Sequence, residues 1–305
     1  MEHGGQLVSP FRHGASAAIV GQRLLIDGQG VGGSQYITMS TPGVARDREM
    51  YEDPQIVSSY SGTPALQPPE QTVLDGLGPA LRQMDVLDLG VGAGRTAWFL
   101  APHARSYLGL DYSHAMIEQC RRLLPGRAFV VGDASRLDFA ADGSYDFVLF
   151  SYNGIDHLDL PGRERALVEM KRVLRPGGAL VFSSHNANFL PAVIDDYRFR
   201  IHSTARATAR SLKWAAVFTM RNPMLRFRLP LPIGIIRDGQ HAFKSTGVCY
   251  VRPDVQVQTL SRLGLQDIEC AMNDRPDFRP GNDAEVSRFA SPWVYYRCRK
   301  PGGAA

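Results

Sequence analysis

The stretch that decides the fold is residues 86–95, VLDLGVGAGR, where a short apolar run containing one acid leads into three glycines. Single residues separate the glycines, which stand at Gly90, Gly92 and Gly94. Because glycine lacks a Cβ, it accepts positive φ angles and lets a ligand approach the main chain closely. The pattern predicts a buried strand over 85–89 followed by a ligand-binding loop.

Helices and strands are predicted to alternate around this stretch. Apolar runs predict strands at 85–89, 106–111, 127–133, 145–153, 177–186, 265–272 and 293–300, and helices over 68–83, 95–100, 115–124, 160–174 and 254–264. Strands joined through helices of about ten residues indicate right-handed crossovers and a mainly parallel sheet covered on both faces. We therefore predict an α/β fold, doubly wound around a mostly parallel seven-stranded sheet with an antiparallel C-terminal strand.

Composition divides the chain further. The expected parts are a poorly ordered, glycine-rich extension (1–45), a main domain (46–189 and 246–300) and an Arg-rich helical lid insertion (190–245). Met39 is an alternative natural start, so whether residues 1–38 belong to the native protein stays open.

Charge and cysteine content restrict the class of protein. The net charge is +4, and no apolar run approaches the roughly 18 to 20 residues that a membrane span needs. The four cysteines are far apart and form no CxxC pair. We expect a cytoplasmic protein with no metal site and no membrane partner.

Acids stand where the predicted strands end. The first strand ends in the glycine loop, the second at Asp111, the third at Asp133 and the fourth at Tyr152 and Asn153. Parallel strands end at one edge of the sheet, where open α/β folds bind ligands. A dinucleotide fingerprint, GxGxxG, would need a small residue where this chain has Arg95, and a second βαβαβ half is missing, so that interpretation is weak.

Together the motifs DxGxGxG (88–94), GDA (132–134) and LRPGGALVFSSHN (174–186), with the strand-end acid between them, resemble class I S-adenosylmethionine-dependent methyltransferases of the small-molecule type. The resemblance runs from about Tyr51 to Lys300 and implies a Rossmann-like fold. It also implies S-adenosyl-L-methionine as the cofactor.

The resemblance assigns roles at this edge. It implies that Gly90, Gly92 and Gly94 border the methionine half of the cofactor and that Asp88 supports its ammonium group. Asp111 would accept hydrogen bonds from both ribose hydroxyls, for which a carboxylate has two acceptor oxygens. The alternative is that Asp111 caps the next helix.

Further predicted cofactor contacts follow from the same resemblance. Asp133 would receive the adenine amino group, with the backbone of Ala134 beside the ring, and Tyr112 and Tyr152 lie at the same edge. Tyr51 and Tyr60 would fold over the methionine portion, where an aromatic ring facing a sulfonium is favourable. The competing interpretation is that one of these two tyrosines only packs against the first helix.

Four residues are candidates for catalysis. The sequence SYNGIDHL after the fourth strand departs from the NPPY-type motif of amino-group methyltransferases. Asn153 would hold an amino or hydroxyl group, and Asp156 or His157 would remove a proton. Alternatively, His157 caps a helix or orients the loop. His185, at the end of the fifth strand, either contacts substrate or braces that strand.

The insertion carries ten cations and three acids between residues 190 and 245. We expect it to cover a small, acidic or amphipathic metabolite, in secondary metabolism, and we expect a monomer or homodimer without a nucleic-acid partner. Methyl transfer to an O, N or C nucleophile is the leading hypothesis. The alternatives are a lyase or cyclase that releases methylthioadenosine, a noncatalytic cofactor-binding module, and an RNA methyltransferase.

Overall fold

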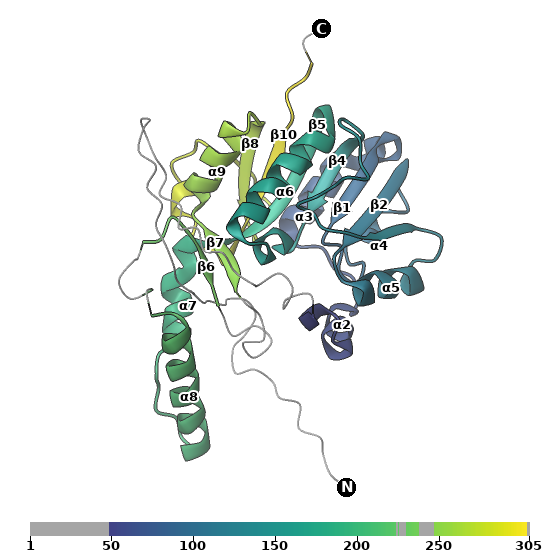
Figure 1. Cartoon of the computed structure of the whole chain (residues 1–305). Coiled ribbons are helices and arrows are strands. Elements are labelled where there is room, and N and C mark those ends of the chain that lie inside the picture. Colours follow the sequence, from purple (N-terminus) through teal and green to yellow (C-terminus); the bar gives the residue numbers. More distant parts are fainter. Residues whose placement is uncertain (1–48, 224, 226–229, 238–246, 304–305) are drawn as a thin grey trace.

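In the computed structural model, residues 49–223, 225, 230–237 and 247–303 are described, and Figure 1 traces their arrangement. The expectations for residues 1–45, including the question of Met39, lie outside these ranges. Within the described ranges, no helix combines the length and apolar character needed to cross a bilayer.

One mixed sheet forms the centre of the domain (Figure 1). The strands β1 to β5 are mutually parallel and lie in the spatial order β3-β2-β1-β4-β5. Their bounds are β1 Asp85–Leu89, β2 Ser106–Asp111, β3 Ala128–Val131, β4 Tyr145–Phe150 and β5 Leu174–Asn186. Strand β10 (Trp293–Arg299) runs antiparallel to β5 and to β8 (Gln266–Met272). The predicted doubly wound fold with an antiparallel C-terminal strand is confirmed.

The sheet is larger than predicted: all seven predicted strands are present, but the described sheet has ten. The additional strands are β6 (Ile233–Ile236), β7 (Val248–Val251) and β9 (Arg279–Pro280). β6 pairs antiparallel with β7, and β7 lies parallel to the end of β5. These strands have at most four residues, too short for periodicity to separate them from loops.

Helices α3, α4, α5, α6 and α9 cover the two faces of the sheet, whereas α8 projects away from it (Figure 1). The bounds of the α-helices are α2 Pro54–Tyr60, α3 Pro68–Leu77, α4 Ala97–Leu100, α5 His114–Leu123, α6 Leu160–Val173, α7 Leu190–Asp196, α8 Ala205–Arg221 and α9 Pro253–Arg262. Alternate residues of β1 separate the two cores, since Val86 packs toward α3, α4 and α5 whereas Leu87 packs toward α6 and α9. Both faces are therefore buried, as a parallel sheet requires.

Local capping sets where the helices begin beside the sheet edge. The Ser113 hydroxyl accepts a hydrogen bond from the Met116 amide at 3.1 Å and starts α5 two residues after β2 ends. The Asp159 carboxylate caps α6 in the same way through the Gly162 amide at 2.7 Å. Short connections of this kind hold the strand-end acids in fixed positions at one edge.

Candidate active site

A cavity of about 400 Å³ opens at the carboxyl ends of the parallel strands. This volume lies within the range of small-molecule sites. Among the residues that line the cavity are all but one of those predicted to bind the cofactor: Tyr51, Tyr60, Asp88, Gly90, Gly92, Asp111, Tyr112, Asp133, Ala134 and Tyr152. The exception is Gly94. The structure thus brings together residues from a sequence span of more than 100 positions.

The three loop glycines share positive φ angles but serve different purposes. A Cβ on Gly90 would stand 2.6 Å from the Phe150 ring, and one on Gly94 would stand 3.4 Å from Cys120 Sγ. At Gly92, with φ +55°, a Cβ would meet no atom within 4 Å. The open space that a closely approaching ligand needs is therefore found at Gly92, whereas packing explains the other two glycines.

Asp88 is buried in the cavity wall, and no cationic side chain of the described residues pairs with its carboxylate. Its Oδ2 accepts hydrogen bonds from the Thr96 hydroxyl at 2.6 Å and the Tyr107 hydroxyl at 2.8 Å. Burial raises the pKa of Asp88 to about 6, and these two hydroxyls only partly oppose the increase. The side chain is an acceptor that a positively charged ligand group would stabilise in its ionised form.

Asp111 ties the strand end to the glycine loop. Its Oδ2 accepts from the Gly92 amide and its Oδ1 from the Ser113 amide, both at 2.9 Å. Since Ser113 is the N-cap of α5, Asp111 stabilises the turn but is not the helix cap. Burial raises the pKa of Asp111, and the amides counteract this effect. Each carboxylate oxygen keeps a second lone pair that can accept from a ligand.

Asp133 occupies the corresponding place after β3. Its Oδ1 accepts from the Ser135 amide at 2.8 Å, and a single β-bridge joins Asp133 to Arg136. Ala134 is buried beside it. Like Asp88 and Asp111, Asp133 makes no ion pair within the part of the chain that the structure describes. Three acids without cation partners thus line one cavity.

Aromatic side chains close one side of the cavity. The Tyr51 ring lies edge-on to those of Tyr60, Tyr112 and His157, at centroid distances of 5.9, 5.8 and 5.5 Å. Its hydroxyl lies 3.2 Å from His157 Nε2. Tyr51 and Tyr60 also pack in a small apolar cluster with residues of α2 and α5. This cluster contains no described residue of the first predicted helix, 68–83, against which one tyrosine was expected to pack.

Sequence reasoning missed a buried ion pair next to this cavity. Arg95 donates to both oxygens of Glu70, at 2.6 and 2.7 Å. The hydroxyls of Ser151 and Tyr295 also donate to Glu70 Oε1. Burial raises the pKa of Glu70, but the Arg95 hydrogen bonds and charge outweigh it, and the pKa is lowered overall. The sequence signals were Arg95 directly after the glycines and the capping-box position of Glu70.

The end of β4 is strained where it meets the cavity. Tyr152 and Asn153 have φ angles of 54° and 61°, in the left-handed region that non-glycine residues rarely adopt. The Tyr152 ring packs edge-on against Trp293 at 4.8 Å, and the Arg95 guanidinium lies 4.8 Å from its centre. Backbone strain of this kind costs about 1 to 3 kcal/mol per residue and is concentrated at functional sites.

Of the four catalytic candidates, His157 alone lines the cavity. Asp159, not His157, caps α6, so the capping alternative for His157 does not hold. Asn153 is buried, and its backbone amide donates to the Ser183 hydroxyl at 2.8 Å. Its Oδ1 has no hydrogen-bond partner in the described ranges.

Asp156 and His185 meet in a buried cluster behind the cavity wall. Asp156 Oδ2 lies 2.9 Å from His185 Nδ1 and accepts from the His185 amide at 2.6 Å. Its Oδ1 accepts from the Ser184 hydroxyl at 2.8 Å and from Arg163 Nε at 3.4 Å. These contacts attach the short helix η2 (Gly154–His157) to β5, which matches the bracing interpretation of His185.

Fold and site together define a class of protein. Residues 86–178 match a family described as a methyltransferase domain. This match agrees with the resemblance to class I S-adenosylmethionine-dependent methyltransferases that the glycine loop and the strand-end acids carry.

Three comparisons illustrate the relationship. The chain is 40% identical over 111 residues to the demethylmenaquinone methyltransferase of Beutenbergia cavernae, a match that covers 36% of this chain and 44% of that protein. It is 26% identical over 196 residues to the malonyl-(acyl-carrier protein) O-methyltransferase of Enterobacter lignolyticus, covering 63% and 76%. The 4+2 cyclase SpnF superimposes with a TM-score of 0.53 at 16% identity, covering 86% of this chain and 98% of that one, and shares the fold alone.

The match to the demethylmenaquinone methyltransferase covers only part of each protein. The chain spans less than half the length of the demethylmenaquinone methyltransferase it matches. The segment that matches the methyltransferase-domain family, residues 86–178, contains the glycine loop and strands β2 to β4.

Proposed function

We propose that the protein transfers the sulfonium methyl group of S-adenosylmethionine to an O, N or C nucleophile of a small, acidic or amphipathic metabolite. The observation that carries the proposal is the cavity in which Asp88, Asp111 and Asp133 have no cation partner within the described residues and Gly92 faces open space. Asp88 and Asp111 are buried, and a buried acid is costly unless a positive charge or hydrogen-bond donors, such as those of a ligand, compensate for its burial.

The residues present fit this cofactor. Asp88, with its pKa raised to about 6 by burial, would hold the ammonium group, and the second lone pairs of Asp111 would accept from the ribose hydroxyls. Asp133 and the backbone of Ala134 would hold the adenine. When bound, the cofactor supplies an electrophilic methyl group on a positively charged sulfur.

The chain's own part in the reaction is positioning and proton removal. Tyr51 and Tyr60 would exclude water over the methionine portion, and correct alignment of two reactants supplies on the order of 7 to 11 kcal/mol. His157 faces the cavity with Nε2 at 3.2 Å from the Tyr51 hydroxyl, and would accept a proton from the nucleophile directly or through Tyr51. Asn153, Asp156 and His185 would act from behind the wall by fixing the position of η2.

The relatives favour this reaction over the alternatives. Similar curated proteins include methyltransferases that act on demethylmenaquinone, phthiotriol dimycocerosates and malonyl-(acyl-carrier protein), which disfavours a lyase that releases methylthioadenosine and a module without activity. The proposal also includes a cytoplasmic location, a monomer or homodimer, and no nucleic-acid partner.

Product analysis tests the proposal. The purified protein is incubated with S-adenosylmethionine, first alone and then with a panel of hydroxylated, amino and carboxylated acceptors, and released nucleosides are identified by mass spectrometry. Acceptor-dependent adenosylhomocysteine is the expected product. Methylthioadenosine would point to the lyase reaction, and tight binding without turnover across the panel would point to a binding module.

A further inference from the structure

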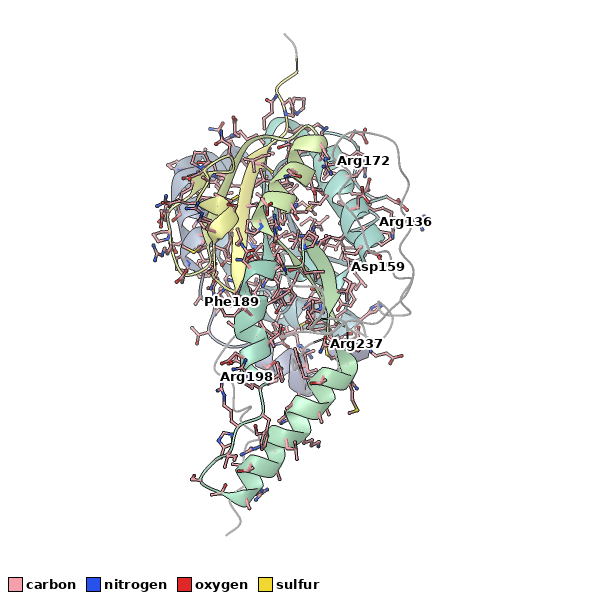
Figure 2. The ribbon with its side chains drawn as sticks, turned by 90° about the vertical axis from the view of Figure 1, so that its left-hand side faces the viewer. Arg136, Asp159, Arg172, Phe189, Arg198 and Arg237 are labelled. Atoms are coloured by element: carbon pink, nitrogen blue, oxygen red, sulfur yellow. The ribbon has the colours of Figure 1, made fainter. Side chains whose placement is uncertain are left out.

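An arm projects from the domain beyond the sheet. It consists of α8 and the preceding segment 197–204, and we call residues 197–221 the basic arm (Figures 1 and 2). Hydrogen bonds to side chains join the segment 197–204 to α8. The Arg200 amide donates to the Ser211 hydroxyl at 2.9 Å, and the His202 amide donates to the Thr208 hydroxyl at 3.0 Å. The arm is therefore an ordered hairpin.

The base of the arm is attached through one face of α8. The rings of Tyr197 and Phe218 stack at 4.3 Å with an interplanar angle of 5°. Phe218 is the buried residue of this helix, and Trp214 and Val217 pack partly against the same cluster. The face of α8 that points toward the domain is therefore packed against other side chains.

The opposite face of α8 exposes an apolar stripe. Leu212, Ala216 and Met220 follow each other at intervals of four residues and therefore lie on one side of the helix. Leu212 is 56% exposed and Met220 is 72% exposed, and Ile201 in the adjoining segment is 83% exposed. Large apolar side chains gathered at this degree of exposure mark an interaction surface.

Positive charge borders this stripe. Arg206, Arg210 and Lys213 are exposed and stand three to four residues apart, so they form a second row along α8 beside the apolar one. Arg206 and Arg210 make no ion pair with any described residue. The sequence from 197 to 237 contains nine Lys and Arg residues and no acid. Just before the arm, Asp195 forms ion pairs with Arg198 and Arg200.

We propose that the basic arm docks on an anionic lipid surface, with α8 lying in the plane of the interface. A helix with an exposed apolar stripe and a row of cations beside it buries the stripe at the headgroup boundary while the cations contact anionic lipids. The helix has 17 residues and is not apolar enough to span, so it lies on the membrane rather than across it. This surface contact revises the expectation of no membrane partner and does not depend on the proposed function.

The charge pattern favours lipid over two other occupants. A second copy of the chain joined through the same patch would place the cation row of one arm near that of the other, which costs energy. An RNA backbone would satisfy the cations but would leave the stripe of Leu212, Ala216 and Met220 in water. An anionic lipid surface would bury the apolar stripe and pair with the row of cations at the same time.

Vesicle sedimentation with the full-length protein tests the proposal. Phosphatidylcholine vesicles with and without about 30 mol% phosphatidylglycerol are compared at about 0.05 and 0.3 M salt. We expect binding to the anionic vesicles that falls with salt. The double variant Leu212→Ser/Met220→Ser and the double variant Arg206→Gln/Arg210→Gln should each lose roughly tenfold or more in partitioning.

The control is Arg82→Gln/Arg122→Gln, which removes two exposed arginines outside the arm and should partition like the unmodified chain. Adenosylhomocysteine affinity, measured by calorimetry, should be the same in all four proteins, which separates this proposal from the proposed function. Equal binding to neutral and anionic vesicles, no binding to either, or an equal loss in the control would overturn it. So would arm substitutions that dissociate a dimer in sedimentation equilibrium, or abolish RNA binding, without changing lipid binding.

Discussion

Strand β1 carries an acid at each end, and the two acids have opposite environments. Asp85, at the start, accepts hydrogen bonds from Arg105 at 2.9 and 2.5 Å and from Arg175 at 2.8 Å. These arginines, with Arg105 contributing most, hold the pKa of Asp85 well below its usual range. Asp88, three residues later, has only hydroxyl partners, and burial raises its pKa to about 6.

The difference extends along both edges of the sheet. At the amino edge Asp146, at the start of β4, shares Arg105 and Arg175 with Asp85, so the acids there are neutralised by the protein's own cations. At the carboxyl edge Asp111 and Asp133 resemble Asp88 in having no such partner within the described ranges. Acids at the amino edge pair with the protein's own cations, whereas in the proposed function those at the carboxyl edge accept hydrogen bonds from the cofactor, and Asp88 also binds its positively charged ammonium group.

The largest expected effect comes from filling the open space at the carboxyl edge. Gly92→Val should lower adenosylhomocysteine affinity by more than roughly a thousandfold, because the side chain would enter the cavity and the φ of +55° disfavours a β-branched residue. Isothermal titration calorimetry measures the change. Gly177→Val is the matched control, since Gly177 has φ +79° and open surroundings near the start of β5, outside the cavity. Normal binding by the Gly92 variant would refute the role assigned to this loop.

Removing one acid from each edge should separate the two functions. Asp111→Ala is expected to weaken adenosylhomocysteine binding about a hundredfold, or about 3 kcal/mol, by the loss of charge-assisted hydrogen bonds. Asp146→Ala, at the amino edge, should leave affinity within about twofold. Circular dichroism verifies that both variants are folded. A loss of affinity in both variants, or in neither, would contradict the claim that only the acids of the carboxyl edge bind the cofactor.

The raised pKa of Asp88 predicts a pH dependence. Because the ionised form holds the cofactor's ammonium group, affinity should fall as pH falls through about 6, by roughly tenfold between pH 7 and 5. In Asp88→Asn this part of the dependence should disappear. Titrations at several pH values in one buffer system measure it, and an unchanged profile in the variant would assign the titration to another group.

The smallest effect concerns stability without ligand. Asp85→Asn should lower the free energy of unfolding at pH 7 by about 1 kcal/mol, since Asp85 has a lowered pKa and its ionised form stabilises the fold above its unfolded pKa near 4. Asp88→Asn should cost less or stabilise, because a raised pKa means that stability declines as pH rises from about 4 to 6. One amide oxygen can replace Asp88 Oδ2, which accepts both hydroxyls. Urea unfolding that ranks the two variants the other way would contradict this.

Much of the fold could be predicted from the sequence because buried parallel strands appear there as continuous apolar runs. The order of seven strands and the gathering of Asp88, Asp111 and Asp133 at one edge both follow from topology. Because all parallel strands of a sheet end at the same edge, residues that follow different strands in the sequence lie close together there. The short strands β6 and β9 have too few residues for such a signal.

The buried networks could not be predicted in this way. Glu70 joins Arg95, Ser151 and Tyr295 across sequence separations of 25, 81 and 225 residues, and no local pattern links them. Strand-end position likewise did not reveal that His185 turns toward Asp156 instead of the cavity. Side-chain direction at a strand end depends on packing around it, which sequence spacing does not encode.

The most direct test is a crystal structure of the protein with adenosylhomocysteine. The account predicts density along the carboxyl edge, with the ribose at Asp111, the amino acid portion between Asp88 and Gly92, and the adenine at Asp133. Density elsewhere on the molecule, or none in crystals grown at saturating ligand, would contradict the claim that the acids of this edge bind the cofactor.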